Sequence, residues 1–177
     1  MTFTDSILVH PASTPEDLIT VRALFSAYAA SLPIDISFQN FTQELSSLPG
    51  KYDLASGGVL LLAQSSDPSS SPSSSSSSDT PPPALGCVAV RALDGPSCCE
   101  MKRLYVTEPG RGQGIGKRLL RSAVQAARDL GYREIRLDTL PSMHAAIGMY
   151  REVGFREIEA YYDTPVVGTM FFGLVLD

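Results

Sequence analysis

The stretch Cys99–Tyr132, CEMKRLYVTEPGRGQGIGKRLLRSAVQAARDLGY, combines the patterns of a strand, a glycine-rich turn and a long helix. Two-residue alternation predicts a strand over Cys99–Val106, with one face made of Glu100, Lys102, Leu104 and Val106. Apolar residues then recur at spacings of three and four, which predicts a helix that buries Ile115, Leu119, Ala123, Ala126, Ala127 and Leu130. Gly131 ends this helix, because glycine readily adopts the left-handed conformation that follows a helix C-terminus.

The turn between strand and helix, Arg111–Lys117, has the sequence RGQGIGK. Its glycines let the backbone approach a ligand closely, since they carry no Cβ. The first N–H groups of the following helix have no partner within the helix, and the positive end of the helix dipole lies beside them. Phosphate is the usual guest at such a helix start, so the turn predicts a phosphate-bearing ligand.

Two nucleotide-binding patterns can be compared with this turn. A Walker A loop requires Ser or Thr after its Lys, but Arg118 follows Lys117, so that pattern fails. A dinucleotide fingerprint is closer, because Gly112 and Gly114 fit and Asp138 lies at a suitable distance. Lys117 occupies the third glycine position, and the strand ends too far from the glycines. A nicotinamide enzyme therefore stays open only as a minor alternative.

The same residues resemble the GCN5-related N-acetyltransferase (GNAT) family. Its signature is Arg or Gln, two residues, Gly, one residue, then Gly or Ala, and the chain has Arg111, Gly114 and Gly116 at these positions. The signature follows a strand that ends in an apolar residue, any residue and Val, as Leu104–Val106 does here. The resemblance implies an α/β (α+β mixed-sheet) fold of about six to seven strands and four helices.

A second part of the resemblance lies downstream. The family has a helix with the pattern N-x-x-A-x-x-L-Y-x-x-x-G-F, and the chain matches it at Ala146, Tyr150, Gly154 and Phe155. Met143 stands where the Asn would be, so one polar contact to the cofactor is not implied. The specific motifs are confined to residues 100–155, although the resemblance covers most of the chain.

The resemblance implies acetyl-coenzyme A as the co-substrate, with no metal. The strand end would pair with the pantetheine arm, and the turn would hold the pyrophosphate. The implied cofactor-binding residues are Leu104, Tyr105, Val106, Arg111, Gly112, Gln113, Gly114, Ile115, Gly116 and Lys117. Cations cluster around this turn while residues up to Ser97 are mainly acidic, a distribution that suits a polyanionic cofactor.

Acetyl transfer to an amine needs a proton acceptor, because an ammonium group with a pKa near ~10.4 is not nucleophilic at neutral pH. Glu100 is predicted as the general base, acting directly or through a water, since some GNAT enzymes place a catalytic Glu at this point of the strand. The alternative is that Glu100 pairs with Lys102 or Arg103. Tyr150 matches the position from which a hydroxyl protonates the departing thiolate, and its alternative role is plain core packing.

His144 is a weaker alternative for the base, because it also fits a surface position at the helix start. The resemblance places a donor for the developing oxyanion on the strand-end backbone near Leu104.

At 177 residues and 44% hydrophobic composition, the chain is expected to form one GNAT domain over residues 1–177. A Ser/Pro-rich segment over residues 65–83 cannot bury apolar area, so it predicts a disordered loop insertion between strands. The three cysteines have no metal-binding spacing, and adjacent Cys98 and Cys99 do not readily bridge each other. With no secretory signal or membrane span in sight, we expect a cytoplasmic or nuclear protein.

The remaining elements follow from local patterns. Thr14 followed by Pro15 predicts a helix start, and a second helix is predicted from Phe38 to Leu48. Strands are predicted over residues 6–9, 59–63, 85–93, 134–138 and 169–176, and a further helix over residues 143–153. In the family, the two N-terminal helices roof the acceptor site.

The acceptor is the least determined feature. The acidic residues Glu16, Asp17, Asp35 and Glu44 predict a small cationic amine or an amino acid derivative as the acceptor. A protein N-terminus or lysine stays open as an acceptor, as does a non-catalytic acyl-CoA sensor that needs neither Glu100 nor Tyr150. No nucleic acid or membrane partner is expected, and a homodimer stays open.

Overall fold

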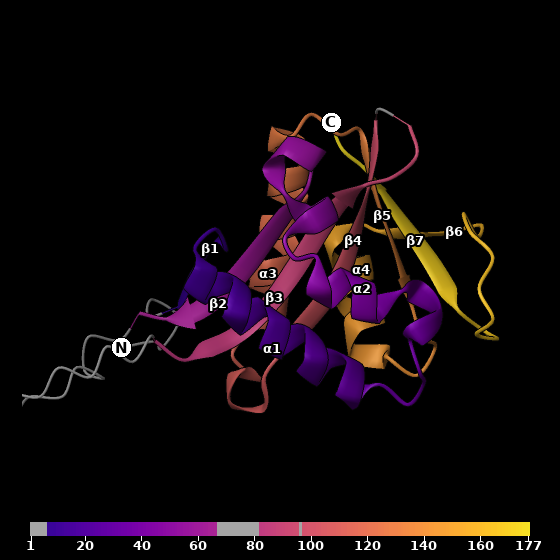
Figure 1. The fold of residues 1–177 in the computed structure, drawn as a ribbon. Coiled ribbons are helices and arrows are strands. Elements are labelled where there is room, and N and C mark those ends of the chain that lie inside the picture. The colour runs from indigo at the N-terminus through magenta and orange to yellow at the C-terminus, as the bar shows by residue number, and fades with distance from the viewer. Residues whose placement is uncertain (1–6, 67–81, 96) are drawn as a thin grey trace, which may run out of the picture.

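A computed structural model describes residues 7–66, 82–95 and 97–177. They form one seven-stranded sheet in the order β1-β2-β3-β4-β5-β7-β6 (Figure 1). Its strands are β1 (Ile7–Pro11), β2 (Val59–Ser65), β3 (Ala84–Ala92), β4 (Cys98–Val106), β5 (Glu134–Thr139), β6 (Arg156–Ile158) and β7 (Met170–Val175). All neighbouring pairs are antiparallel except β4 and β5, which run parallel. The predicted mixed α/β sheet is thereby confirmed.

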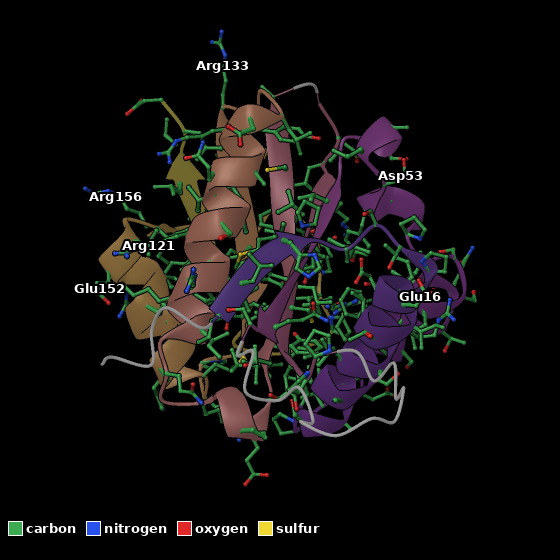
Figure 2. All side chains as sticks on the ribbon, turned by 90° about the vertical axis from the view of Figure 1, so that its left-hand side faces the viewer. Glu16, Asp53, Arg121, Arg133, Glu152 and Arg156 are labelled. Atoms are coloured by element: carbon green, nitrogen blue, oxygen red, sulfur yellow. The ribbon has the colours of Figure 1, made fainter. Side chains whose placement is uncertain are left out.

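Helices cover both faces of this sheet. The α-helices are α1 (Pro15–Ser31), α2 (Phe41–Ser46), α3 (Ile115–Asp129) and α4 (His144–Val153). Short 3-10 turns are η2 (Ser37–Gln39), η3 (Gly50–Tyr52), η4 (Leu54–Ser56) and η6 (Glu108–Gly110). In Figures 1 and 2, α1 and α2 lie on one face, and α3 and α4 lie on the other. Among the described residues, no helix is both long and apolar enough to cross a membrane.

Alternation along β2 divides the core into two layers. Leu61 and Ala63 pack with α3, whereas Leu60 and Leu62 pack with α1. The predicted apolar side of α3 is buried at Ile115 and along the helix as expected, and Gly131 follows it with φ +84°. The sheet is therefore apolar on both faces in this part, as expected for a layer between two sets of helices.

An irregularity in β4 corrects one sequence prediction. Arg103 has φ +60°, and the pairing with β3 gains an extra residue there, because Cys87 pairs with Tyr105 while Ala89 pairs with Lys102. A one-residue bulge reverses the alternation of the side chains beyond it.

The predicted common face of Glu100, Lys102, Leu104 and Val106 is therefore wrong. Leu104 and Val106 contact the α3 layer, as Met101 does before the bulge. Glu100 and Lys102 lie on the face covered by α1 and α2, where Arg103 also reaches Glu44 of α2. The bulge could not be read from the alternation, since it depends on a residue outside the usual backbone regions.

The parallel strands β4 and β5 separate along their length. They pair only at Cys98 with Glu134, Cys99 with Ile135, and Glu100 with Arg136. Beyond Glu100, no residue of β4 pairs with β5, and the structure describes both strands in full. One edge of the β4 backbone is thus left without a strand partner, and it borders the cleft described below.

Three further predictions differ in detail. The helix predicted from Phe38 to Leu48 is divided into η2 and α2 at Asn40, which has φ 56°. The short strand β6 was not predicted. Most of the loop predicted over residues 65–83 lies outside the described residues, because residues 67–81 are not described.

Candidate active site

The central feature is a cleft of about 380 Å³ where β4 and β5 separate. Its walls come from the end of α1, the segment before α2, the ends of β4 and β5, and α4. Residues of both predicted groups line it, namely Leu104, Tyr105, Val106, Arg111, Gly116 and Tyr150. The fold thus brings the cofactor motif and the downstream helix motif to the same opening.

The glycine turn lies at the end of this cleft. Gly112 and Gly114 both have φ +75°, a conformation that residues with a Cβ rarely adopt. The backbone amide of Arg118 donates to the Gly114 carbonyl. The backbone amides of residues 112–117 have no acceptor among the described residues. No side chain caps α3 either. The predicted anion site therefore has open donors at a helix N-terminus.

A groove of about 590 Å³ extends from the turn along α3. Lys117, Arg118 and Arg121 line it and give it a positive charge. Lys117 also forms an ion pair with Glu152 of α4, so its ammonium group is partly neutralised. The amide of Lys117 nevertheless belongs to the open set, so its predicted role in cofactor binding has a backbone basis.

Asp138 is the carboxylate that the cleft exposes. It lies at the end of β5, its side chain is 19% exposed, and its Oδ1 atom is 3.8 Å from Nζ of Lys102. Lys102 also lines the cleft but is otherwise buried. Burial lowers the pKa of Lys102, while the nearby Glu100 and Asp138 oppose this shift. Sequence analysis assigned no catalytic role to Asp138, because its position depends on how β5 diverges from β4.

Glu100 is enclosed rather than open to the cleft. Its side chain is 1% exposed, and Nε and Nη2 of Arg91 donate to Oε2 at 2.9 and 2.7 Å. The Tyr161 hydroxyl donates to Oε1 at 2.8 Å, and Nζ of Lys102 lies 3.9 Å from the same oxygen. The predicted pairing with Lys102 is therefore present, and the predicted pairing with Arg103 is not. Lys102, which lines the cleft and also lies 3.8 Å from Asp138, connects this carboxylate to the cleft.

Tyr150 of α4 faces the cleft from the side of the sheet opposite to α1 and α2. Its ring packs near Phe155 and Phe172, while its hydroxyl has no hydrogen-bond partner among the described residues. Burial raises the pKa of Tyr150, and the nearby Tyr28 and Asp138 add to the shift. The hydroxyl therefore stays protonated at neutral and mildly alkaline pH. His144, the alternative base, is exposed at the start of α4.

Sequence analysis did not place two tyrosines of the α1 face at the site. Tyr28 of α1 lines the cleft, and burial raises its pKa although Arg103 opposes the shift. The Tyr162 hydroxyl is buried without a hydrogen bond of normal geometry. Burial and the neighbouring Asp138 raise the pKa of Tyr162. The adjacent pair Tyr161-Tyr162 was visible in the sequence, but no pattern indicated where it would fold.

The four acidic residues behind the cationic-acceptor prediction do not line the cleft. Asp17 caps α1, and Figure 2 shows Glu16 on the outside of the same helix, across the sheet from Arg121 and Glu152. Asp35 accepts hydrogen bonds from Ser37, and Glu44 is bound to Arg103. Their charges are therefore remote or already matched. Within the described residues, no group of three His, Cys, Asp or Glu side chains could hold a metal ion.

Comparison with known proteins gives a consistent result. The model of the acetyltransferase (GNAT) family matches residues 77–155. An uncharacterized N-acetyltransferase of Schizosaccharomyces pombe is 34% identical over 169 residues, which are 96% of this chain and 94% of that protein. A GNAT-family acetyltransferase from Staphylococcus aureus has a similar fold, with a TM-score of 0.72, 20% identity, and coverage of 97% of this chain and 100% of that one.

A second solved structure is informative about the ligand. YncA of Salmonella typhimurium, described as a putative acetyltransferase, was solved with its cofactor acetyl-CoA. It is 15% identical to this chain, with a TM-score of 0.69 and coverage of 97% of this chain and 95% of that one. At this identity the likeness concerns the fold alone.

Proposed function

The chain belongs to the acetyltransferase (GNAT) family, and from this premise we propose that it transfers the acetyl group of acetyl-CoA to the primary amine of a small molecule by direct attack in a ternary complex. The open amides of residues 112–117, beside a cleft that Asp138 and Tyr150 face from two sides, carry this proposal. Of the two predicted acceptor classes we favour an amino acid derivative, since the carboxylates expected to attract a cation lie elsewhere.

The residues present fit acetyl-CoA as the donor substrate. The amides of residues 112–117 would hold its pyrophosphate, because unpaired N–H groups at a helix start bind anions. The unpaired edge of β4 up to Val106 would pair with the pantetheine arm as an added strand does. Acetyl-CoA supplies an activated thioester, and a backbone N–H near Leu104 would donate to the carbonyl oxygen as it gains negative charge.

Two side chains would carry out the proton transfers, one as acceptor from the amine and one as donor to the thiolate. The amine forms a bond to the carbonyl carbon and becomes positively charged, so it must lose a proton to a base. Asp138 is the accessible carboxylate for this step, and the predicted base Glu100 would act only through Lys102 and Asp138. The carbon–sulfur bond then breaks, and the Tyr150 hydroxyl protonates the departing thiolate.

The experiment is an amine panel with acetyl-CoA, followed by release of free thiol, for the wild type and for Tyr150→Phe, Asp138→Asn and Glu100→Gln. We expect Tyr150→Phe to lower kcat by roughly 100-fold at all pH values, as loss of a general acid does. Asp138→Asn should lower kcat at low pH and recover at high pH, where the amine loses its proton to solvent. Tyr132→Phe is the matched control, because its hydroxyl binds the Gly57 carbonyl outside the cleft.

If none of the amines in the panel causes thiol release, the proposed function is contradicted. Unchanged kinetics in both Tyr150→Phe and Asp138→Asn would also contradict it. Glu100→Gln removes the carboxylate partner of Arg91 and leaves Lys102 paired with Asp138 alone, so its melting temperature is measured beside its kinetics. A loss of kcat in Glu100→Gln without a change in stability would favour Glu100 over Asp138.

A further inference from the structure

A second cavity lies beside the cleft on the face covered by α1 and α2. It has a volume of about 370 Å³ and is bounded by η2, α2, η3 and β3. Its polar lining consists of Gln39, Asn40, Gln43, Glu44, Ser47, Lys51, Tyr52 and Arg91. Neither family motif includes any of these residues.

Arg91 presents unused donors to this cavity. Its Nε and Nη2 atoms both donate to the same oxygen, Oε2 of Glu100. A guanidinium group has five N–H donors, and no other acceptor among the described residues binds those that remain. The Arg91 side chain is 27% exposed and lines the cavity, so an incoming acceptor group can reach it.

The carboxylate in the cavity wall, Glu44, is already neutralised. Arg103 binds both of its oxygens at 3.0 and 2.7 Å, and the Tyr52 hydroxyl donates to it at 2.6 Å. Burial opposes the charge of Glu44, but its bonds to Arg103 outweigh burial and lower the pKa. Glu44 therefore stays ionised and is matched by Arg103.

The charge balance of the cavity is therefore positive. Lys51 is exposed at its edge and forms no ion pair within the described part of the chain. Arg91 and Lys102 share Glu100, and Lys102 also lies 3.8 Å from Asp138, so these two cations face two carboxylates and Lys51 supplies the excess positive charge. Amide and hydroxyl groups in the wall add neutral donors. A cavity of this kind is complementary to a carboxylate, which accepts charge-assisted hydrogen bonds from Arg and Lys.

The cavity adjoins the reaction cleft. Gln39 lines both, and Nη1 of Arg103 donates to the Gln39 side chain at 2.9 Å. Arg91 of β3 lies directly opposite Glu100 of the neighbouring strand β4, and Lys102 lies two residues further along β4 on the same face. The Arg91–Glu100 pair and the Lys102 position are therefore separated by about 7 Å along β4.

We propose that the acceptor carries a carboxylate several bonds from its amine, held by Arg91 and Lys51 in this cavity while the amine lies beside Asp138. The inference rests on the proposed acetyl transfer and specifies its substrate class: an ω-amino acid or a peptide-like amino acid derivative. The spacing of about 7 Å exceeds the separation of amine and carboxylate in an α-amino acid. Such an α-amino acid should therefore be the poorer acceptor.

The test compares matched acceptors that differ only in charge, 5-aminopentanoate and its amide, with glycine and glycinamide as the short pair. We expect wild-type kcat/KM to favour 5-aminopentanoate over the amide by roughly tenfold or more, and to show no such preference for the short pair. Lys51→Glu should remove the preference by raising KM for the acid. Arg91→Gln should act in the same direction.

Arg133→Glu is the matched control, because it makes the same change in charge at an exposed residue that lines neither cavity (Figure 2). Loss of the preference in Arg133→Glu as well would overturn the proposal, since it would indicate a general effect of net charge. Equal kcat/KM for 5-aminopentanoate and its amide would also overturn it, and would leave the acetyl transfer itself intact.

Calorimetry with N-acetyl-5-aminopentanoate separates this proposal from the proposed function, because the ligand cannot be acetylated again. Binding that Lys51→Glu weakens and Arg133→Glu does not would support the carboxylate site even if no amine is a substrate. No binding to the wild type, together with no acid preference in turnover, would overturn it.

Discussion

Helices α1 and α3 begin on opposite faces of one sheet, and they differ in how the N–H groups of their first turns are hydrogen-bonded. At α1 the Thr14 side chain accepts from the Asp17 amide, and the Asp17 carboxylate accepts from the amides of Ser13 and Thr14. At α3 no side chain caps the helix, and the amides of residues 112–117 are open. In the first arrangement the chain satisfies its own N–H groups, whereas the second leaves N–H groups that water or a ligand can satisfy.

The ion pairs of the two faces differ in the same way. On the α1 face, Arg103 of β4 and Glu44 of α2 form a buried pair, with 2% and 13% of their side chains exposed. On the α3 face, Lys117 and Glu152 form an open pair with exposures of 33% and 61%. The Arg103–Glu44 pair therefore joins two elements of the fold, whereas the Lys117–Glu152 pair beside the turn is accessible to a charged ligand.

The largest expected effect concerns the buried pair. Arg103→Met should lower the free energy of unfolding by about 3–5 kcal/mol, because it leaves the Glu44 charge buried without its partner. Lys117→Met is the control, and we expect no measurable change from it, since the exposed pair with Glu152 is screened by solvent. Urea unfolding measures both. Equal destabilisation by the two variants would remove the contrast between the faces.

Next in size is a change at the open N-terminus of α3. Gly114→Val should lower kcat/KM for acetyl-CoA by roughly 100-fold, since a side chain there distorts the turn that presents the phosphate donors. Gly131→Val is the control: it also has positive φ and open space around its Cβ position, but it lies at the other end of α3. Comparable kinetic losses in both variants would show that backbone strain alone is responsible.

The self-capped helix α1 should give a smaller effect, and on stability alone. Thr14→Ala removes one partner of the capping box and should cost about 1 kcal/mol of unfolding free energy. Since Thr14 is remote from the cleft, the kinetics with acetyl-CoA should match the wild type. A rise in KM for acetyl-CoA would contradict the division of roles between the two helix starts.

The smallest expected effect is on the pH dependence of stability. Arg103 lowers the pKa of Glu44 against the effect of burial, so the folded state binds a proton less readily than the unfolded state. This contribution is fully present above the ordinary glutamate pKa of about 4.3 and is lost as pH falls through the lower folded value. The stability difference between wild type and Glu44→Gln should therefore narrow below that pH. A difference that stays constant from neutral to acidic pH would exclude this role for Glu44.

The sequence was most informative where chemistry depends on local backbone. Gly112 and Gly114 adopt the positive φ that a glycine-rich turn requires, and α3 buries the side that its periodicity predicts. The motif match at Tyr150 also placed that residue at the cleft. The predicted common face of Glu100, Leu104 and Val106 is wrong, because Arg103 adopts a left-handed conformation and reverses the alternation of β4 beyond it.

Local sequence by itself determined the part of the protein that we propose binds acetyl-CoA, since a turn, a helix start and a strand end lie within a few residues of each other. Only the tertiary structure decided which residues line the proposed acceptor site. Asp138, Tyr28, Arg91 and Lys51 come from four separate parts of the chain. The divergence of β4 from β5 and the packing of α2 over the sheet bring them to the cleft and its neighbouring cavity. Short-range patterns encode backbone conformation, whereas the charges that meet across a sheet depend on long-range packing.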